Sequence, residues 1–485
     1  MPPRQPTLTR LPITLRPDPR RVIARFFGAD DNRNRRRLER ILSLPDNVAE
    51  RLLARLEEDY GHQHRDLVEI WMAHFERVAP LLPVAWQNVP ERRRLLAGAY
   101  FTMEYAVESS ALFNPSIVPL PDQSPAPPGT TRFLMSLRAT GEGHISSVVF
   151  RRGSIDRNNH LIIEEAGAVA RPLQDVPDAE FDTSRYRVAL AEAGLLGPLE
   201  EQVLERLGLS FSMEELEREL LAVRPASPTE GAWEQTYRNM TAVARSSYKL
   251  LIGDDVSVAE AVIFPRSENE SRGIEDLRLT LFTEEDGFRH IYGTYTAYNG
   301  TAIFPTLMET GDLRVITIAT LTGRCARNKG MALFPRRIGG RYVCSGRIDG
   351  ENLYILYTDN ILVWNEAYLA MEPLHWWEFS VIGNCGSPIE TPEGWLLLTH
   401  GVGPMRQYCI GAALLDLKDP TKVLGRSREP LIAPEEDERS GYVPNVVYTC
   451  GAMLHNDVIL IPYALSDHST TFAYVPLEEL LASLE

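Results

Sequence analysis

Residues 395–415 read WLLLTHGVGPMRQYCIGAALL, and this stretch decides the fold class of the second half of the chain. It contains two short apolar runs, residues 395–399 and 409–415, separated by a polar segment with glycines. Similar runs, rich in Val, Ile, Tyr and Trp and broken by Gly, Asp and Asn, recur from residue 279 to residue 463. Many short strands at such spacing predict a mainly β fold, which is a sandwich, a barrel or a propeller. Periodicity alone does not separate these three architectures.

Outside this strand-rich part, apolar residues recur at the 3.6-residue period of helices. The helical stretches are residues 32–60, 63–79, 91–112 and 186–250. A loop rich in proline ends at residue 128 and predicts a boundary there. We therefore expect a helical extension over residues 1–128 and a β domain over residues 129–485. Within the β domain we expect a helical insertion at about residues 186–245.

The composition of the chain argues against some classes of function. The chain has 485 residues, 44% of them hydrophobic, and its 50 Lys and Arg against 66 Asp and Glu give a net charge of −16. An acidic surface opposes binding to nucleic acid and to anionic membranes. No apolar run reaches the roughly 20 residues that cross a bilayer, and the first residues lack the apolar stretch of a secretory signal. The five cysteines show no paired metal-binding spacing, so we expect a cytoplasmic protein without a metal site.

Charged residues cluster just before one predicted strand, where residues 269–278 read NESRGIEDLR. The adjacent carboxylates Glu275 and Asp276 lie between Arg272 and Arg278. Such neighbours can shift carboxylate pKa values and bind hydroxyls or anions. An ion-paired turn explains the same pattern.

Tyrosines follow in residues 292–300, YGTYTAYNG, where Tyr295 and Tyr298 could stack on sugar faces. A strand that ends in an Asn-Gly turn explains part of this segment. Cations recur in residues 324–330, RCARNKG, and again at Arg347. Lys329 and Arg347 are suited to hold an anion, although exposed cations scattered on loops are the simpler interpretation.

Two further polar positions stand beside glycines or at a strand end. Asn384 lies between Gly383 and Gly386, and glycines allow a close approach of the backbone to a ligand. His400 ends an apolar strand, where a polar side chain can face a cavity. A turn explains the glycines equally well, but it does not explain His400.

Together these segments resemble family 130 of the glycoside hydrolases, which contains mannoside phosphorylases and β-mannosidases. The resemblance covers residues 240–485 and, more loosely, residues 100–165. The motifs that carry it are GIEDLR at 273–278, YTAY at 295–298, KGMALFP at 329–335, GWLLLTHGV at 394–402 and Ser466-Asp467. It implies a mainly β fold, a five-bladed β-propeller with N-terminal and inserted α-helical segments.

The resemblance also implies roles for single residues. Asp276 would be the general acid, and inorganic phosphate, rather than water, would attack the anomeric carbon with inversion. No cofactor or metal is implied, and phosphate is the co-substrate. The implied phosphate-binding residues are Lys329, Arg347, His400 and Tyr408. The implied substrate-binding residues are Arg278, Tyr295, Tyr298, Asp349, Asn384 and Asp467.

The expected function is phosphorolysis of β-mannosides to α-mannose 1-phosphate. Val381 and Ile382 stand where a phosphorylase is expected to have a basic residue, which keeps β-mannosidase activity as an alternative. Hydrolysis needs a carboxylate that activates water, and Glu275, Glu390 and Asp349 are the candidates. A non-catalytic carbohydrate-binding propeller is the third interpretation. The added helices would cover the active site or make a contact in a homo-oligomer.

Overall fold

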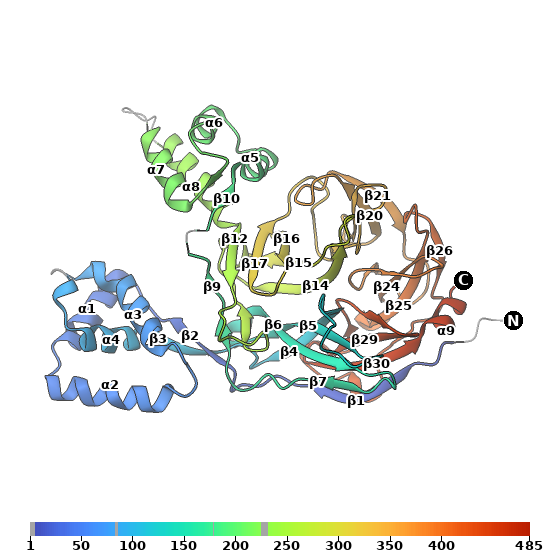
Figure 1. Ribbon diagram of the computed structural model, residues 1–485, viewed down its shortest axis with the longest axis horizontal. Helices are drawn as coiled ribbons and strands as arrows, with labels where there is room; N and C mark the ends of the chain where they lie inside the picture. Colours follow the sequence, from blue (N-terminus) through green and yellow to red (C-terminus); the bar gives the residue numbers. More distant parts are fainter. Residues whose placement is uncertain (1–4, 83–85, 178, 225–230) are drawn as a thin grey trace.

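The computed structural model describes residues 5–82, 86–177, 179–224 and 231–485, and it is mainly β with two groups of helices (Figure 1). Its described residues form five sheets of four to six strands. We name each sheet after the strand at one edge, which is β4, β14, β18, β22 or β27. Each sheet packs against the next, and the β27 sheet packs back against β4 of the first. The five sheets therefore surround a common centre.

The strands follow these orders, and all pairs but β13 with β8 are antiparallel. The β4 sheet contains β4 (Ala111–Pro119), β5 (Thr131–Thr140), β6 (Ser146–Ile155), β13 (Ala261–Ile263) and β8 (Arg171–Pro172), with β7 (Leu161–Ile163) beside β6. The β14 sheet contains β14 (Ile274–Thr283), β15 (Arg289–Tyr298), β16 (Ile303–Thr310), β17 (Val315–Thr320), β12 (Tyr248–Leu251) and β9 (Gln174–Asp175).

The remaining three sheets come from the last third of the chain and from its first strand. The β18 sheet contains β18 (Ala332–Leu333), β19 (Tyr342–Gly346), β20 (Leu353–Thr358) and β21 (Glu366–Met371). The β22 sheet contains β22 (Val381–Asn384), β24 (Trp395–Val402), β25 (Tyr408–Leu415) and β26 (Val423–Arg426), with β23 (Ile389–Glu390) beside β24. The β27 sheet contains β27 (Val447–Tyr448), β29 (Val458–Leu465), β30 (Ser469–Pro476) and β1 (Thr9–Leu15), with β28 (Met453–His455) beside β29.

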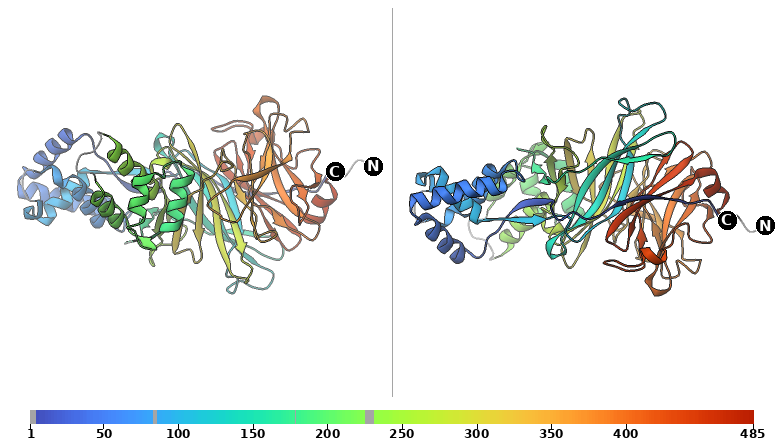
Figure 2. Two further views of the ribbon diagram at one scale, coloured as in Figure 1. Left: turned by 90° about the horizontal axis from the view of Figure 1, so that it is seen from above. Right: turned by 90° about the horizontal axis from the view of Figure 1, so that it is seen from below.

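The helices form two groups at one end of the molecule, away from most of the sheets (Figure 2). The first group lies between the paired strands β2 (Val22–Phe26) and β3 (Thr102–Ala106) and has its own apolar core. It contains α1 (Asp31–Leu42), α2 (Asp46–Tyr60), α3 (Leu67–Val78) and α4 (Glu91–Tyr100). The second follows β10 (Phe181–Asp182) and contains α5 (Thr183–Glu192), α6 (Pro198–Leu204), β11 (Ser210–Phe211), α7 (Met213–Ala222) and α8 (Ala232–Arg245). A short α9 (Leu477–Ala482) follows β30, and no described helix is long and apolar enough to cross a membrane.

Local sequence explains where these helices begin. Asp30 precedes α1 and its side chain accepts a hydrogen bond from the backbone N–H of Arg33. Ser212 and Glu215 form a reciprocal capping box at the start of α7. Such caps satisfy backbone N–H groups that have no partner within the helix. The inserted helices lie where the sequence predicts them, near residues 186–245.

The extension expected over residues 1–128 contains strands as well as helices, and its boundary needs correction. β1 pairs with β30, so that Thr9 lies opposite Tyr474 and the first strand completes the β27 sheet. The expected boundary at residue 128 falls between β4 and β5, which pair within one sheet. The helix expected over residues 91–112 ends at Tyr100, because the following residues pair with β2. Pairing over such sequence distances leaves no trace in local periodicity.

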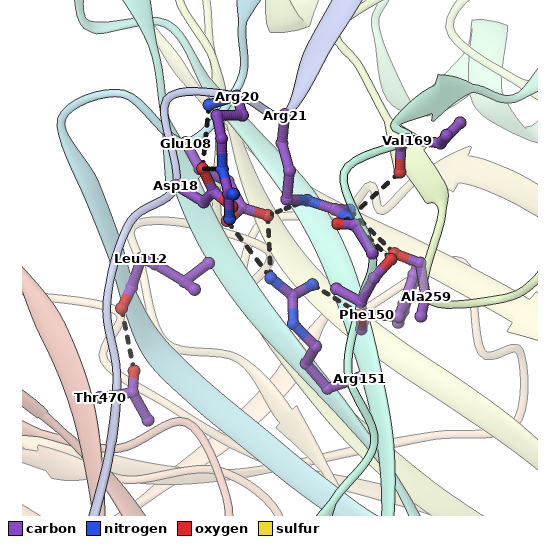
Figure 3. Close-up of polar contacts among 12 residues, drawn as sticks. Asp18, Arg20, Arg21, Glu108, Leu112, Phe150, Arg151, Val169, Ala259 and Thr470 are labelled. Carbon is purple, nitrogen blue, oxygen red and sulfur yellow. Dashed lines mark hydrogen bonds and ion pairs between the residues drawn. The ribbon is translucent and has the colours of Figure 1, made fainter. Parts of the chain in front are cut away.

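A buried ion-pair network attaches the segment between β1 and β2 to the β4 sheet (Figure 3). The fully buried carboxylate of Glu108 accepts hydrogen bonds from Arg21 Nε at 2.7 Å and from Arg151 Nη2 at 3.0 Å. The other nitrogens of Arg21 donate to the carbonyls of Ala166, Gly167, Val169 and Ala259. Every nitrogen of the Arg21 guanidinium has an acceptor, so the network holds distant segments together although two guanidiniums share one carboxylate.

Candidate active site

Asp276 lies at a β-bulge in β14. The register with β15 shifts between Glu275 and Arg278, and Asp276 has a φ of +57°. β4 has a matching irregularity, where Asn114 has a φ of +47°. Asp and Asn tolerate this left-handed conformation better than most residues, and bulges redirect side chains. The two distorted strands meet, since Asn114 Nδ2 donates to Asp276 Oδ1 at 2.7 Å.

Three cations surround this pair of carboxylates. Arg138, at the end of β5, donates to Asp276 Oδ1 at 3.3 Å and to Glu275 Oε1 at 3.0 Å. Lys329 Nζ lies 2.5 Å from Glu275 Oε2. Arg278 is 1% exposed, and it donates to the backbone carbonyl of Asp276 at 2.8 Å. The carboxylates are therefore held by groups from the β4, β14 and β18 sides of the centre.

The surroundings lower the pKa of one carboxyl group in the cluster and raise the pKa of another. Burial favours the neutral form of Asp276, but Arg138 and Arg278, with the hydrogen bond from Asn114, hold its pKa below the ordinary value. Asp467, in the turn between β29 and β30, has its pKa raised to about 6 by burial and then by the charge of Asp276, against the opposing effect of Arg138. Carboxyl groups whose pKa values are pushed apart are typical of catalytic sites.

Arg347 lies on the opposite side of the cluster, just after β19. Its Nε is buried and has no hydrogen-bond partner among the described residues. A Cβ added to Gly383 would lie 2.7 Å from Arg347 Cδ and 2.5 Å from His400 Cε1. A side chain at this position would therefore displace both groups, and glycine leaves room for them. Arg347 therefore has an unpartnered Nε–H donor and lies beside the buried imidazole of His400.

His400, in β24, is 1% exposed, and its Nδ1 lies 3.1 Å from the backbone oxygen of Asn384. Burial, and then the nearby Arg347 and Arg278, hold the pKa of His400 well below its ordinary value. Its ring is parallel to Tyr408, with centroids 6.1 Å apart, and meets the edge of Tyr448 at 4.9 Å. The imidazole is therefore neutral and fixed in orientation.

The structure brings together most of the predicted site residues but not all of them. It places Asp276, Arg278, Lys329, Arg347, Asn384, His400, Tyr408 and Asp467 in or beside this cluster. Tyr295 lies in the apolar core, is 3% exposed and donates to Glu270 at 2.6 Å. Tyr298 donates to the carbonyl of Gly300 within its own turn. Neither tyrosine presents a free hydroxyl to the cluster, so the expectation that they bind sugar is not supported by their contacts.

The three carboxylates considered as the base for hydrolysis lie in different surroundings. Asp349 accepts hydrogen bonds from the backbone of Glu351 and Asn352 and from the Tyr354 hydroxyl, and it therefore shapes a turn. Although its partial burial raises the pKa, these bonds lower the pKa of Asp349 to about 2. Glu390 pairs with Arg336 at 2.5 Å on an exposed strand. Of the three candidates, Glu275 alone contacts the groups around Asp276.

Sequence reasoning missed Asn114, Arg138 and Tyr448. Asn114 and Arg138 belong to the first half of the chain, and Tyr448 Oη accepts a hydrogen bond from Arg278 Nη2 at 2.9 Å. The signal for Arg138 was a charged residue near the end of a predicted apolar strand. Asn114 and Tyr448 carry no such signal, because only the sheet pairing places them at the centre.

The arrangement combines a proton-bearing group with surplus positive charge. Arg138, Arg278, Lys329 and Arg347 face the three carboxylates of Glu275, Asp276 and Asp467. Arg347 makes no ion pair with any described carboxylate, which leaves its charge available to an anion. Among the residues that the structure describes, no group of three or more His, Cys, Asp or Glu could hold a metal ion.

Residues 255–485 match the model of glycoside hydrolase family 130, whose description is beta-1,4-mannooligosaccharide phosphorylase. This segment, just under half of the chain, is similar to family 130. It contains most of the site described above, while Asn114 and Arg138 lie outside it.

Curated relatives bear names that fit family 130. The chain is 36% identical over 155 residues to 1,2-beta-oligomannan phosphorylase of Thermoanaerobacter sp. (strain X514), which covers 32% of this chain and 52% of that protein. It is 31% identical over 235 residues to beta-1,2-mannobiose phosphorylase of Listeria innocua, over 46% of this chain and 63% of that protein. The chain thus spans about half to somewhat under two thirds of these relatives. A solved structure of the Listeria innocua beta-1,2-mannobiose phosphorylase aligns with 78% of this chain and 93% of that chain, at 21% identity and a TM-score of 0.45.

Proposed function

We propose that the protein is an inverting phosphorylase that cleaves β-mannosides with inorganic phosphate and releases α-mannose 1-phosphate. One observation carries the proposal: the unpartnered guanidinium of Arg347 lies in the same cluster as the buried carboxyl group of Asp276. An anion site beside an acid is what phosphorolysis requires. The names of the relatives that share 31% and 36% identity support the mannoside substrate and favour a β-1,2 linkage.

In the proposed mechanism, Asp276 supplies the proton that the leaving sugar oxygen needs. Its pKa is held low by Arg138 and Arg278 without substrate, and a bound sugar would exclude water and shift the balance toward the protonated acid. One oxygen of phosphate attacks the anomeric carbon as the glycosidic carbon–oxygen bond breaks. The proton moves from Asp276 to the leaving oxygen, and the proton that phosphate brings restores Asp276. Phosphate itself is the nucleophile, so no base has to activate water.

The cations would hold phosphate against the low-dielectric site. Lys329 and Arg347 offer an ammonium and a guanidinium, and His400 and Tyr408 line the same side. Charge-assisted hydrogen bonds of this kind are about twice as strong as neutral ones. We assign Arg278, Asn384 and Asp467 to substrate binding or support of the subsite.

We also propose that the five sheets are the blades of a five-bladed propeller whose axial mouth carries this site. Support comes from the circular order in which the sheets contact one another and from β1, which joins the last sheet. The site draws residues from all five sheets, as an axial site would. We further propose that the enzyme is cytoplasmic and needs phosphate but no cofactor.

Hydrolysis is the second candidate, because Glu275 lies in the cluster beside Asp276. As a base it would have to activate water. Lys329 and Arg138 already donate to its two oxygens, so an attacking water would have to compete with them. The same contacts suit a carboxylate that positions Lys329.

The test is the release of sugar from β-1,2-mannobiose with and without phosphate, with detection of mannose 1-phosphate. Phosphate-dependent release is expected. Sugar release without phosphate would establish the hydrolase instead, and no release from any β-mannoside would favour a binding protein.

Lys329→Ala sharpens this test. Loss of one charged contact to a buried anion should raise the phosphate KM by roughly 30- to 1000-fold while the mannoside KM changes little. Arg324→Ala is the matched control, because Arg324 is an exposed cation of the same segment that donates to the carbonyl of Asn365. It should leave both constants within about twofold. An unchanged phosphate KM in Lys329→Ala would contradict the assignment of Lys329.

A further inference from the structure

His400 presents a hydrogen-bond acceptor where an anion site is expected to present donors. Its Nδ1 lies 3.1 Å from the carbonyl oxygen of Asn384. A carbonyl can only accept a hydrogen bond, so the ring proton must be on Nδ1. The other nitrogen, Nε2, then carries a lone pair unless the ring takes up a second proton.

The surroundings oppose a second proton. The ring is buried, and the charged groups that act on it are Arg347, Arg278 and Asp276. Burial and the two guanidiniums lower the pKa of His400, and the hydrogen bond to Asn384 and the charge of Asp276 compensate only in part. The neighbouring ring of Tyr448 adds no charge at neutral pH, because burial raises its pKa. The imidazole therefore stays neutral, and Nε2 has no donor among the described residues.

Nε2 belongs to the same small space as Arg347. A Cβ on Gly383 would lie 3.1 Å from Nε2, 2.5 Å from Cε1 and 2.7 Å from Arg347 Cδ. A Cβ on Gly330, beside Lys329, would lie 3.6 Å from Arg347 Nε. The Arg347 side chain and the His400 ring therefore border the same side of Gly383.

We propose that His400 Nε2 accepts a hydrogen bond from the protonated oxygen of phosphate, and that the site thereby selects oxyanions that carry a proton. This inference rests on the proposed function. At neutral pH phosphate retains at least one P–OH group, whereas sulfate has none. Sulfate would place an oxygen lone pair against that of Nε2 and leave both without a partner, which binding sites penalise. Arginine and lysine supply the attraction for either anion, and His400 supplies the discrimination.

Two pairs of anions of matched size test the inference: phosphate with sulfate, and arsenate with selenate. Arsenate carries a proton at neutral pH, and selenate does not. In the wild-type enzyme, competition against phosphate should give sulfate and selenate inhibition constants roughly 10- to 100-fold above the constants for phosphate and arsenate. Equal affinity within each pair would overturn the inference while phosphate-dependent cleavage, and with it the proposed function, would stand. Absence of any phosphate dependence would refute the proposed function first.

Two variants assign the discrimination to Nε2. His400→Asn keeps a short amide that can donate to the carbonyl of Asn384 but removes the distal acceptor. His400→Gln can present either an amide oxygen or an amide nitrogen at the distal position, so it can bind anions with a proton and anions without one. Both variants should lower the phosphate-to-sulfate preference to within about threefold, and because this is a ratio of affinities, a loss of stability or of overall affinity does not enter it. If both variants lower the affinity for all four anions equally, His400 contributes to the shape of the pocket and does not distinguish protonated from unprotonated anions.

Discussion

Two clusters of charge lie on either side of the β4 sheet region, and they are built differently. In the Arg21–Glu108–Arg151 network, each nitrogen of Arg21 donates to a carboxylate or a carbonyl. In the cluster around Asp276, Arg347 Nε and Arg278 Nε are buried without hydrogen-bond partners among the described residues. The donors of Arg21 are satisfied within the protein, whereas the second cluster leaves two buried donors without partners among the described residues.

The difference indicates how a structural ion pair can be told apart from a binding site. Burial alone does not separate them, because Arg21 and Arg278 are both 1% exposed. The cluster around Asp276 differs in combining unused donors with carboxyl groups whose pKa values diverge, as those of Asp276 and Asp467 do, since buried donors without partners also occur at Arg94, Arg152 and Arg341. A buried group that lacks a partner costs free energy, which a bound ligand can recover.

The largest expected effect is on turnover. Asp276→Asn keeps the size of the side chain but cannot deliver a proton, so kcat should fall by about 10²–10⁴ with a natural mannoside. An aryl mannoside with a good leaving group needs little protonation and should lose less. The thermal midpoint should fall only modestly, because Glu275 still pairs with Arg138 after the change. Steady-state kinetics on both substrates with calorimetry measures all three quantities.

Glu390→Gln is the matched control for this change from carboxylate to amide. Glu390 pairs with Arg336 on the exposed strand β23 and should be neutral for kcat within about twofold. Equal losses on both substrates in Asp276→Asn would remove Asp276 from the role of acid. A large loss in Glu390→Gln would reopen the search for a catalytic base.

The reverse pattern is expected in the structural cluster. Glu108→Gln leaves two buried guanidiniums without a counter-charge and should lower the free energy of unfolding by about 3–5 kcal/mol. The folded variant should keep its kcat at a temperature well below its thermal midpoint. Asp18→Asn, which breaks the nearby exposed pair with Arg20, should leave the midpoint almost unchanged. If Glu108→Gln unfolds no earlier than Asp18→Asn, the network does not stabilise the fold.

The smallest expected effect is a pH-dependent gain in stability. The pKa of Asp467 is raised to about 6 from 3.8, so the unfolded chain releases this proton at lower pH than the folded chain. Stability is therefore lost between about pH 4 and pH 6 and stays lost above that window. Asp467→Asn removes the ionisation and should be more stable than wild type above pH 6, by up to about 3 kcal/mol, and equal to it below pH 4. Thermal midpoints across this range measure the difference, and a constant offset at all pH values would contradict it.

Much of the fold was predictable from local sequence. Apolar runs such as residues 395–399 and 409–415 form β24 and β25, because their alternation and composition suit buried strands. The inserted helical segment was predicted from its period as a single stretch over residues 186–250, and the structure divides it into α5, α6, α7 and α8. The position of β1 was not, because its partner β30 lies at the other end of the sequence and strand pairing over that distance has no local signature.

Some residues of the candidate site could also be predicted from the sequence, and others could not. Asp276, Lys329 and Arg347 stand out as charged residues beside glycines and strand ends, and the structure brings them together. The burial of Tyr295 was not predicted, because the sequence of a strand does not say which face meets the core, and its hydroxyl donates to the buried Glu270. Asn114 was missed because its role depends on a bulge that only the pairing of β4 with β5 reveals.

The pairing of β1 with β30 also has a consequence for biosynthesis. Thr9 and Tyr474 are opposite each other but are about 465 residues apart, so at ordinary translation rates β1 waits roughly 25–90 s for its partner. During that time β1 is an unpaired strand on the nascent chain, and when β30 emerges its free edge can accept a strand from any copy nearby. The β27 sheet is therefore completed only after nearly the whole chain has been synthesised.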